Sequence, residues 1–590
     1  MAGIAEAVAS RWSRRTVTAG SERLEGDSHM DRFWLAQYPP GTATDIDASR
    51  WSSIKALVEA SCPRHAARVA FTQMGRAMTY GELDTLSAGF AAWLQQAGFR
   101  KGERIAIMLP NVLQYPVAIF GALRAGLVVV NTNPLYTPPE LEHQLTDSGA
   151  TAILVLENFA ATVQAVAQRT QLRTILVTGV GDMLGFPRGA LVNFVLRHVQ
   201  RKVPAWSLPR AQRFGDVLRH AAGQIPQPVD VGHDDIAFLQ YTGGTTGVAK
   251  GAMLTHGNLV ANVLQAQAWF SQVALDHARY ICALPLYHIF SLTANCLLFT
   301  SLGGTGVLIT NPRDFPHFVK ELRANPPMFL MGVNTLFNAL MNTPGFAELD
   351  FSHLVGTLGG GMAVQRAIAE RWKQMTGCRI TQGWGLTETS PVACVNPLVG
   401  PDNEFNGSVG LPVSSTEVSI RDDAGGDMGI DISGEICVRG PQVMRGYWNR
   451  PDETAKVMLP EGWLRTGDIG RMDSRGFVFI EDRKKDMIVV SGFKVFPNEV
   501  EDVVAQMPGV REVAAVGVPD ERSGEAVVLF VVRQDPALTE AAIQQFCHKQ
   551  LTGYKLPRHV YFRNELPKTN VGKILRRALR DELVRSNPAS

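Results

Sequence analysis

The chain has 590 residues, of which 45% are apolar and 19% are charged. This length exceeds the size at which one hydrophobic core keeps growing, so at least two domains are expected. The 57 basic and 55 acidic side chains leave a formal net charge of +2, which is too small to indicate nucleic acid as the main partner. The composition is typical of a globular protein and excludes a fibrous or disordered chain.

The N-terminal segment lacks the pattern of a secretory signal. Residues 1–29 carry Arg11, Arg14 and Arg15 but no continuous apolar stretch. Because Met30 opens a segment typical of an ordinary start, we interpret residues 1–29 as an extension or as a start assigned too early. The seven cysteines form no Cys-x-x-Cys pair, so they indicate neither a disulfide framework nor a zinc cluster. A reducing, cytoplasmic location is therefore predicted.

Helical and β-branched patterns alternate through most of the chain. Alternation of this kind predicts parallel sheets that are covered by helices. The strands are predicted at 104–108, 127–130, 304–309 and 354–358, and the helices at 80–97 and 138–147.

From Thr416 onward the pattern changes to short strands and turns, which predicts a small β-rich subdomain. A charged stretch at 481–486 is followed by a new alternation of helices and strands. The predicted fold class is α/β, with a large N-terminal domain at 30–484 and a small, mobile α+β C-terminal domain at 485–590. The elements predicted here are strands at 417–420, 435–438, 476–480, 513–518 and 527–532 and helices at 497–506 and 538–551.

Two segments bear on contact with a membrane. The uncharged stretch Ile289–Pro312 contains polar residues and a Gly-Gly pair, so we expect buried helix and strand rather than a span. Between Phe186 and Leu208, four basic residues accompany apolar residues at helical spacing. This pattern is typical of a helix that rests on the inner face of the cell membrane, and equally of a surface helix whose apolar stripe packs on the core.

The most informative segment runs from Leu239 to Gly251. Three glycines and three threonines within six residues supply backbone N–H groups and hydroxyls that can surround phosphate oxygens. Lys250 adds a positive charge, although it stands three residues after Gly247 and so departs from the usual P-loop. A flexible turn would explain the glycines but not this mixture. The predicted nucleotide-binding residues are Tyr241, Thr242, Gly243, Gly244, Thr245, Thr246, Gly247 and Lys250.

This segment and four later ones resemble the motifs of the adenylate-forming superfamily, which includes acyl-CoA synthetases, luciferases and the adenylation domains of peptide synthetases. Taken alone, an aspartate such as Asp468 is typical of a turn, and the region of Lys573 is typical of a solvated basic tail. The order of the motifs along the chain favours the resemblance. The later segments are Pro285–Phe290, Gly383–Glu388, Gly462–Asp468 and Pro567–Arg577.

The resemblance implies a role for each motif. His288 lines the carboxylate pocket, and Trp384, which replaces the more usual tyrosine, stacks on adenine without the hydrogen bond of a phenol. Asp468 binds the ribose hydroxyls together with Arg483, since a carboxylate can accept two hydrogen bonds from a vicinal diol. Lys573 is the catalytic lysine.

Further roles follow from the same resemblance. Thr245 and Glu388 are assigned to Mg²⁺, and Lys485 is the hinge between the two domains. Gly492 and Lys494 lie near the channel for the pantetheine arm of coenzyme A. The other nucleotide contacts are Gly361, Gln382, Gly383 and Thr387.

Within the superfamily, Leu109–Pro116, Asn131–Tyr136 and Val490–Glu499 resemble bacterial long-chain fatty-acid–CoA ligases, and the match runs from about Met30 to about Leu583. It implies that ATP activates a long-chain fatty acid as acyl-adenylate before transfer to coenzyme A, a step of β-oxidation. The alternatives are an enzyme that adenylates another carboxylic acid or serves a carrier protein, a luciferase-like oxidase and a non-enzymatic fatty-acid binder. The sequence leaves a monomer and a homodimer equally open.

Overall fold

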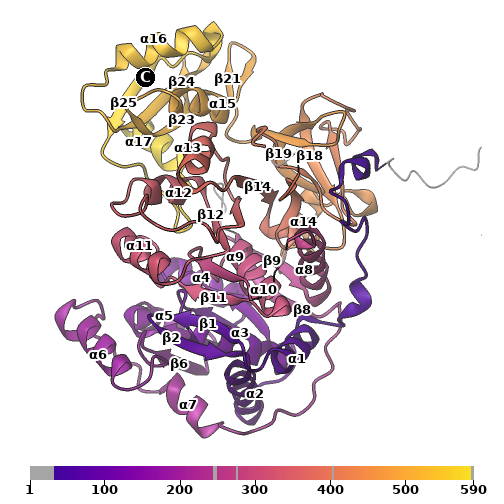
Figure 1. The fold of residues 1–590 in the computed structure, drawn as a ribbon, viewed down its shortest axis with the longest axis vertical. Coiled ribbons are helices and arrows are strands. Elements are labelled where there is room, and N and C mark those ends of the chain that lie inside the picture. The colour runs from indigo at the N-terminus through magenta and orange to yellow at the C-terminus, as the bar shows by residue number, and fades with distance from the viewer. Residues whose placement is uncertain (1–31, 243–248, 274, 276, 401–403, 587–590) are drawn as a thin grey trace, which may run out of the picture. The chain divides into compact units, whose positions relative to one another are not determined.

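The structure, a computed structural model, describes residues 32–242, 249–273, 275, 277–400 and 404–586. Figure 1 shows the ribbon, coloured from indigo near the N-terminus to yellow near the C-terminus. The described strands form two large mixed sheets, a small antiparallel sheet and a C-terminal mixed sheet.

The first large sheet joins strands from distant parts of the chain. Its strands are β1 (Val69–Gln73), β2 (Arg76–Thr79), β10 (Arg279–Cys282), β11 (Thr305–Leu308), β12 (Phe329–Gly332), β13 (Gly356–Gly359), β14 (Ile380–Gly385), β15 (Val392–Val395) and β16 (Leu411–Pro412). They lie in the order β16-β15-β14-β13-β12-β10-β11-β1-β2, and the pairings from β1 to β14 are parallel. The carboxyl ends of these parallel strands therefore share one edge of the sheet.

The second large sheet runs in the order β7-β6-β5-β3-β4-β8-β9. Every residue of β4 and β5 is buried, as expected for parallel strands that are covered on both faces. The antiparallel pair β8 and β9 flanks the Gly/Thr-rich segment. The strands are β3 (Arg104–Met108), β4 (Val128–Asn131), β5 (Ala152–Leu156), β6 (Thr174–Thr178), β7 (Ala211–Arg213), β8 (Ile236–Thr242) and β9 (Lys250–Thr255).

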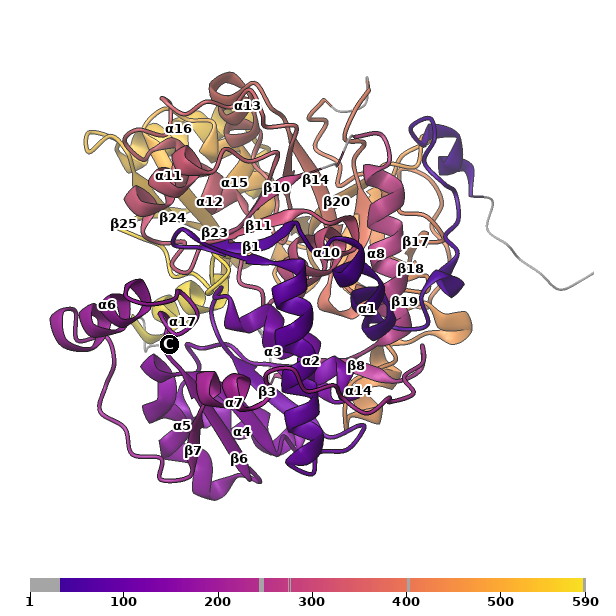
Figure 2. The ribbon, with the colours of Figure 1, turned by 60° about the horizontal axis from the view of Figure 1, so that its bottom comes forward.

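Helices connect and cover these sheets, and Figure 2 shows α1, α2 and α3 side by side, as their contacts require. The helix α2 begins with a capping box, in which Thr79 and Glu82 satisfy each other's backbone N–H groups. The helices of this part are α1 (Ile54–Arg64), α2 (Tyr80–Gln96), α3 (Gln114–Arg124), α4 (Pro138–Ser148), α5 (Ala160–Val166), α6 (Arg188–Phe194), α7 (Phe214–His220), α8 (His256–Phe270), α9 (Ile289–Ser291), α10 (Leu298–Leu302), α11 (Phe315–Ala324), α12 (Asn334–Met341), α13 (Arg366–Thr376) and α14 (Pro451–Val457).

The remaining strands and helices lie in the C-terminal third of the chain. The small antiparallel sheet has the order β17-β18-β19-β20, and in the last sheet β23 and β24 pair along their whole length. A separate core of aliphatic side chains lies between this last sheet and the helices α15 and α16. The elements are β17 (Glu417–Arg421), β18 (Gly434–Arg439), β19 (Leu464–Met472), β20 (Val478–Arg483), β21 (Ile488–Val490), β22 (Phe493–Val495), β23 (Val510–Asp520), β24 (Gly524–Arg533), β25 (His559–Arg563), α15 (Pro497–Ala505), α16 (Glu540–Gln550) and α17 (Arg576–Ser586).

The predicted fold class is confirmed, with a large N-terminal α/β part, a β-rich sheet and a small C-terminal α+β part. The stretch Ile289–Pro312 forms α9, the π-helical turn η6 (Leu292–Leu297), α10 and β11. Within the part of the chain that the structure describes, no helix is long and apolar enough to cross a membrane. The helix predicted between Phe186 and Leu208 is shorter than expected, since it ends with the π-helical turn η5 (Val195–Val199).

Candidate active site

A cavity of about 1760 Å³ lies at the carboxyl edge of the first sheet. The chain leaves β10, β12 and β13 in loops that bring Tyr287, Asn334 and Gly361 to the cavity wall, and β14 brings Trp384. The C-terminal part contributes Lys573. A cavity at the ends of parallel strands that also lies between two domains is the usual position of a ligand site.

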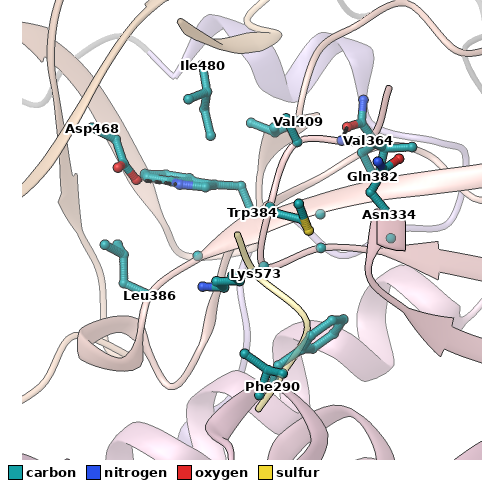
Figure 3. Close-up of a pocket in the computed structure, with 18 of the residues that line it drawn as sticks. Phe290, Asn334, Val364, Gln382, Trp384, Leu386, Val409, Asp468, Ile480 and Lys573 are labelled. Carbon is teal, nitrogen blue, oxygen red and sulfur yellow. Dashed lines mark hydrogen bonds between the residues drawn. The ribbon is translucent and has the colours of Figure 1, made fainter. Parts of the chain in front are cut away.

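Trp384 and Asp468 are joined by a hydrogen bond in this wall (Figure 3), and Arg483 forms an ion pair with Asp468. The Trp384 indole Nε1 donates to Asp468 Oδ2 at 2.9 Å, and Arg483 Nε lies 2.6 Å from Asp468 Oδ1. Asp468 of β19 is paired with Arg483 of β20, and its side chain is 4% exposed. The strand pairing therefore fixes the carboxylate beside the guanidinium, where it can accept hydrogen bonds from a diol. The indole N–H supplies a contact to Asp468 that the sequence did not reveal.

Glu388 is oriented by a neighbouring phenol. The Tyr447 hydroxyl donates to Glu388 Oε1 at 2.7 Å, and both residues line the cavity. Burial, together with the charge of Glu388, raises the pKa of Tyr447 well above its ordinary value, so the hydroxyl stays a donor. Lys250 pairs with Glu453 of α14 and lies 5.1 Å from the centre of the Tyr447 ring. Tyr447 thus links the predicted metal-binding glutamate to the predicted phosphate-binding lysine.

Lys573 enters the cavity on a turn of the C-terminal part. Its backbone N–H donates to Thr569 Oγ1 at 3.0 Å, and Thr335 of α12 donates to the Gly572 carbonyl at 3.0 Å. Figure 3 shows the Lys573 side chain in the pocket between Leu386 and Phe290. Burial and the nearby charge of Arg483 lower the pKa of Lys573 to about 8, against an opposite effect of Asp468 and Glu388. The lysine is thus placed beside the carboxylates of the large domain.

Most other predicted residues line the same cavity. Burial, with a smaller effect of Lys573, lowers the pKa of His288 to about 3, so its imidazole is neutral at physiological pH. Gln382 donates to the Ser408 carbonyl at 2.9 Å and accepts a bond from the Val364 N–H at 3.3 Å, which holds the loop after β13. The predicted residues in the lining, besides those described above, are Tyr241, Thr242, Lys250, Gln382, Gly383, Thr387, Lys485 and Lys494.

Two groups of predicted residues are not among the described residues that line the cavity. Gly492 is exposed with a φ of +83° and is not among the described residues that line the cavity, whereas Lys494, two residues later, is. The segment Gly243, Gly244, Thr245, Thr246 and Gly247 lies outside the described residues. Its flanks, Thr242 at the end of β8 and Lys250 at the start of β9, both line the cavity.

The cavity also has a group of apolar lining residues. They come from the C-terminal end of α8, from η6 and α10, and from β15. Trp269 is 3% exposed, and Tyr38 packs against it edge to face with ring centres 5.1 Å apart. Such a wall suits an acyl chain, because it offers apolar contact without polar partners. The apolar lining residues here are Ala266, Trp269, Phe270, Ala294, Leu298, Val392 and Val395.

Sequence reasoning missed Arg576. Its guanidinium bonds Glu501 Oε2 at 2.8 Å, Asn498 Oδ1 at 2.5 Å and Asp482 Oδ1 at 3.1 Å. Burial raises the pKa of Asp482 to about 6, although Arg576 and backbone N–H groups favour its charged form. Asp482 lies in β20 of the small antiparallel sheet and Arg576 in the C-terminal part, so this cluster connects these two parts of the chain beside Lys573. The only sequence signal was the basic run that contains Arg576.

The chain belongs to the family of AMP-binding enzymes. The family model described as "AMP-binding enzyme" matches residues 58–448, and the model of the "AMP-binding enzyme C-terminal domain" matches residues 499–573. Both matches contain residues of the cavity, including Trp384 in the first and Lys573 in the second.

Several curated relatives carry one name. The chain is 54% identical to a long-chain-fatty-acid–CoA ligase of Escherichia coli O157:H7, over 94% of this chain and 98% of that protein. It is 36% identical to a long-chain-fatty-acid–CoA ligase of Bacillus subtilis, over 93% of this chain and 98% of that protein.

Solved structures share the fold. An anthranilate CoA ligase in complex with anthranoyl-AMP has a TM-score of 0.82 at 25% identity and covers 92% of this chain and 100% of its own. ATP-bound MatB from Rhodopseudomonas palustris has a TM-score of 0.77 at 27% identity and covers 90% of this chain and 99% of its own.

Proposed function

We propose that the protein is an ATP-dependent acid–thiol ligase that activates a long-chain fatty acid as its acyl-adenylate and transfers the acyl group to coenzyme A. The observation that carries this proposal is the meeting of Asp468, Arg483 and Lys573 in one cavity that also has a group of apolar lining residues. The names of the relatives support the long-chain acid as the substrate class.

In the first half-reaction, a carboxylate oxygen of the acid attacks the α-phosphorus of ATP, the bond to the bridging oxygen breaks, and pyrophosphate leaves. Asp468 and Arg483 hold the ribose, and Trp384 presents its ring to the adenine. The Lys573 ammonium stabilises the negative charge that develops between the carboxylate and the α-phosphate. The neutral His288 lies in the wall of the carboxylate pocket, where it adds no competing charge.

The cavity is suited to Mg²⁺. Glu388 places a carboxylate there, and the Tyr447 hydroxyl fixes the orientation of that carboxylate. Mg²⁺ prefers oxygen ligands and is commonly bound by one or two carboxylates together with substrate phosphates. We propose that Glu388 and Thr245 hold the ion, which would neutralise charge on the phosphates.

In the second half-reaction, the sulfur of coenzyme A attacks the acyl carbon, its proton is released, and AMP leaves. We propose that the C-terminal domain, from Lys485 onward, first rotates and withdraws Lys573. Lys485 lies in a turn in which Asp486 N donates to the Arg483 carbonyl at 3.0 Å. Lys494 and Gly492 would then approach the pantetheine arm. Rotation lets one cavity serve two steps that need different groups.

The test is incubation of the purified protein with ATP, Mg²⁺, palmitate and coenzyme A, followed by measurement of AMP and acyl-CoA. Both products are expected in equal amounts. A panel of acids from short to very long, and a carrier protein offered in place of coenzyme A, test the alternative acids and acceptors. Absence of thioester with every acid would refute the proposal.

We propose that this activity is cytoplasmic and involves peripheral contact with the inner face of the cell membrane. A long-chain fatty acid partitions into lipid, because each methylene group favours an apolar environment by about 0.8 kcal/mol. An enzyme that touches the bilayer would therefore meet its substrate at a higher local concentration.

A further inference from the structure

The helix formed by α6 and η5 exposes several large apolar side chains. Four large apolar side chains in or next to it are strongly exposed: Phe186 at 92%, Leu191 at 63%, Phe194 at 56% and Val199 at 66%. Figures 1 and 2 both show α6 at the margin of the ribbon. A π-helical turn follows Phe194 and extends to Val199. In this turn the backbone N–H of Gln200 donates to the Val195 carbonyl, five residues earlier.

Two polar side chains of the same helix are held against the protein by hydrogen bonds and an ion pair. Asn193 is 9% exposed, accepts a bond from Gly181 N at 2.8 Å and donates to Asp182 Oδ1 at 2.7 Å. Arg197 forms a two-pronged ion pair with Glu157, whose side chain is 2% exposed. Polar contacts therefore help to anchor the helix, beside the half-buried Val192, Val195 and Leu196. The apolar stripe predicted from the sequence packs on the protein only in part, since Leu191 and Val199 are exposed.

The close approach at Gly189 supports this orientation. A Cβ at Gly189 would lie 2.2 Å from the Gly181 carbonyl oxygen, so the polar side of the helix is pressed against the body. Rotation of the helix to bury Leu191 and Phe194 would break the Asn193 and Arg197 contacts. The exposed apolar face is therefore built into the local packing, and such a face usually marks an interaction site.

The charges around the face identify the kind of partner. Between Asp182 and Asp216 the sequence contains six basic residues and no acidic residue, although the whole chain has a net charge of only +2. Two of these six, Arg197 and Arg213, form ion pairs with Glu157. The exposed basic residues are Arg188, Arg201, Lys202 and Arg210. An apolar face bordered by long cationic side chains suits the interface of a bilayer that contains anionic lipids.

We propose that this segment, 186–202, docks the protein on an anionic membrane surface. The apolar side chains enter the boundary between headgroups and acyl chains, while Arg201 and Lys202 at the end of the helix reach the lipid phosphates. Arg197 takes no part, because it is held by Glu157. Binding of the chain to vesicles is measured without ATP, fatty acid or coenzyme A. A failure of the docking proposal can therefore be distinguished from a failure of the proposed ligase activity.

The first experiment measures binding of the full chain to vesicles of phosphatidylcholine with and without phosphatidylglycerol. Leu191→Ser combined with Phe194→Ser should lower the partition coefficient about tenfold or more, because two inserted side chains are lost. The matched control is Ile430→Ser with Ile432→Ser, two residues of comparable exposure, 47% and 48%, in the small antiparallel region. This control should bind as the unchanged protein does.

The second experiment separates charge from apolar insertion. Arg201→Gln with Lys202→Gln should weaken binding to the anionic vesicles roughly tenfold or more and leave the weak binding to neutral vesicles unchanged. Added salt should weaken the anionic binding of the unchanged protein in the same way. Phe186 is the most exposed of the apolar side chains, so its replacement should leave folding unchanged. Phe186→Ser should therefore weaken vesicle binding in a correctly folded protein.

Thermal unfolding midpoints and activity toward a short, soluble acid should match the unchanged protein in all these variants. Vesicle binding that does not change in Leu191→Ser/Phe194→Ser or in Phe186→Ser would overturn the proposal. So would sedimentation of the unchanged protein as a dimer that these substitutions convert to a monomer, since the face would then be covered by a second copy of the chain.

Discussion

The two walls of the active-site cavity hold their functional side chains in different ways. In the large domain, Asp468 is fixed by neighbours of its own wall, because Trp384 and Arg483 both bond its carboxylate. In the C-terminal part, Lys573 stands on a short turn that is held by Thr569 and by a contact with Thr335 across the cavity. The wall that holds Asp468 is therefore fixed within one part of the chain, while Lys573 belongs to the part that we propose withdraws before the second half-reaction.

This difference assigns different consequences to damage on each side. A defect in the wall that holds Asp468 weakens ATP binding in every conformation that binds the nucleotide. A defect in Lys573 affects only the step for which it is present. The following predictions test this comparison, beginning with the largest expected effect.

Lys573→Ala should reduce acyl-adenylate synthesis by about a thousandfold or more, because no neutral side chain can stabilise the developing charge. Thioester formation from supplied acyl-adenylate should stay within about tenfold of the unchanged protein, since a lysine absent from that state cannot act on it. Single-turnover assays of each half-reaction give the comparison, with Lys549→Ala at the exposed end of α16 as the control. Equal losses in both steps would show that Lys573 is misassigned.

Asp468→Ala should lower kcat/KM for ATP roughly 30- to 150-fold, because a charge-assisted hydrogen bond to the ribose is lost. This ratio corresponds to a loss of about 2–3 kcal/mol of transition-state stabilisation. Steady-state kinetics with varied ATP measure this effect. Asp423→Ala removes a carboxylate that is 88% exposed and pairs with Lys484, so it serves as the control and should change the value less than twofold. Unchanged ATP kinetics in the Asp468 variant would remove this residue from the site.

Arg576→Ala should reduce adenylation about ten- to thirtyfold, less than loss of Lys573 itself, because it loosens the domain contact that positions the lysine and leaves Asp482 and Glu501 without their shared partner. Arg576→Lys should recover part of the rate. The neighbouring Arg577→Ala, at a side chain that is 60% exposed, is the control. A fall in the thioester step as large as in adenylation would contradict a role in positioning.

The rate of adenylation should fall as the pH rises. The pKa of Lys573 is lowered to about 8, so the required ammonium form dominates below pH 8 and is lost above it. The value of kcat/KM should therefore be about tenfold lower at pH 9 than at pH 7. Lys573→Arg keeps its charge throughout this range and should remove the alkaline decline, at a lower maximal rate. A pH profile with the same decline in this variant would point to another group.

Trp384→Phe should have the smallest effect, about two- to fivefold in kcat/KM for ATP. The aromatic face is kept, and only the 2.9 Å bond from the indole Nε1 to Asp468 is lost. Since Arg483 still holds the other carboxylate oxygen, Asp468 should remain largely in place. A loss as large as that of Asp468→Ala would mean that the indole, and not the guanidinium, positions the carboxylate.

Local patterns sufficed for much of the fold and for the motif residues. The helical patterns at 80–97 and 138–147 predicted α2 and α4, whose ends lie within one residue of the prediction. These signals are local, because the helical period relates residues three and four positions apart. The residues Asp468, Arg483 and Lys573 were predicted by their motifs, and the structure brings all three to one cavity.

The partners of these residues could not be predicted in the same way. Tyr447 lies 59 positions from Glu388, and Asp482 lies 94 positions from Arg576, so no sequence spacing connects either pair. Each contact exists only because separate strands and helices meet at the cavity. The replacement of tyrosine by Trp384 suggested a lost contact, and only the fold showed that the indole N–H bonds Asp468.

The sequence by itself determined that the chain is an α/β protein, and it predicted a phosphate-binding segment and a basic amphipathic helix within 186–208. Periodicity determines which residues share a face of that helix, but not which face turns outward. The tertiary structure decided this, because the polar anchors Glu157 and Asp182 lie on other segments and turn Arg197 and Asn193 inward. The orientation of a surface helix depends on what its neighbours offer, and that information lies far away in the sequence.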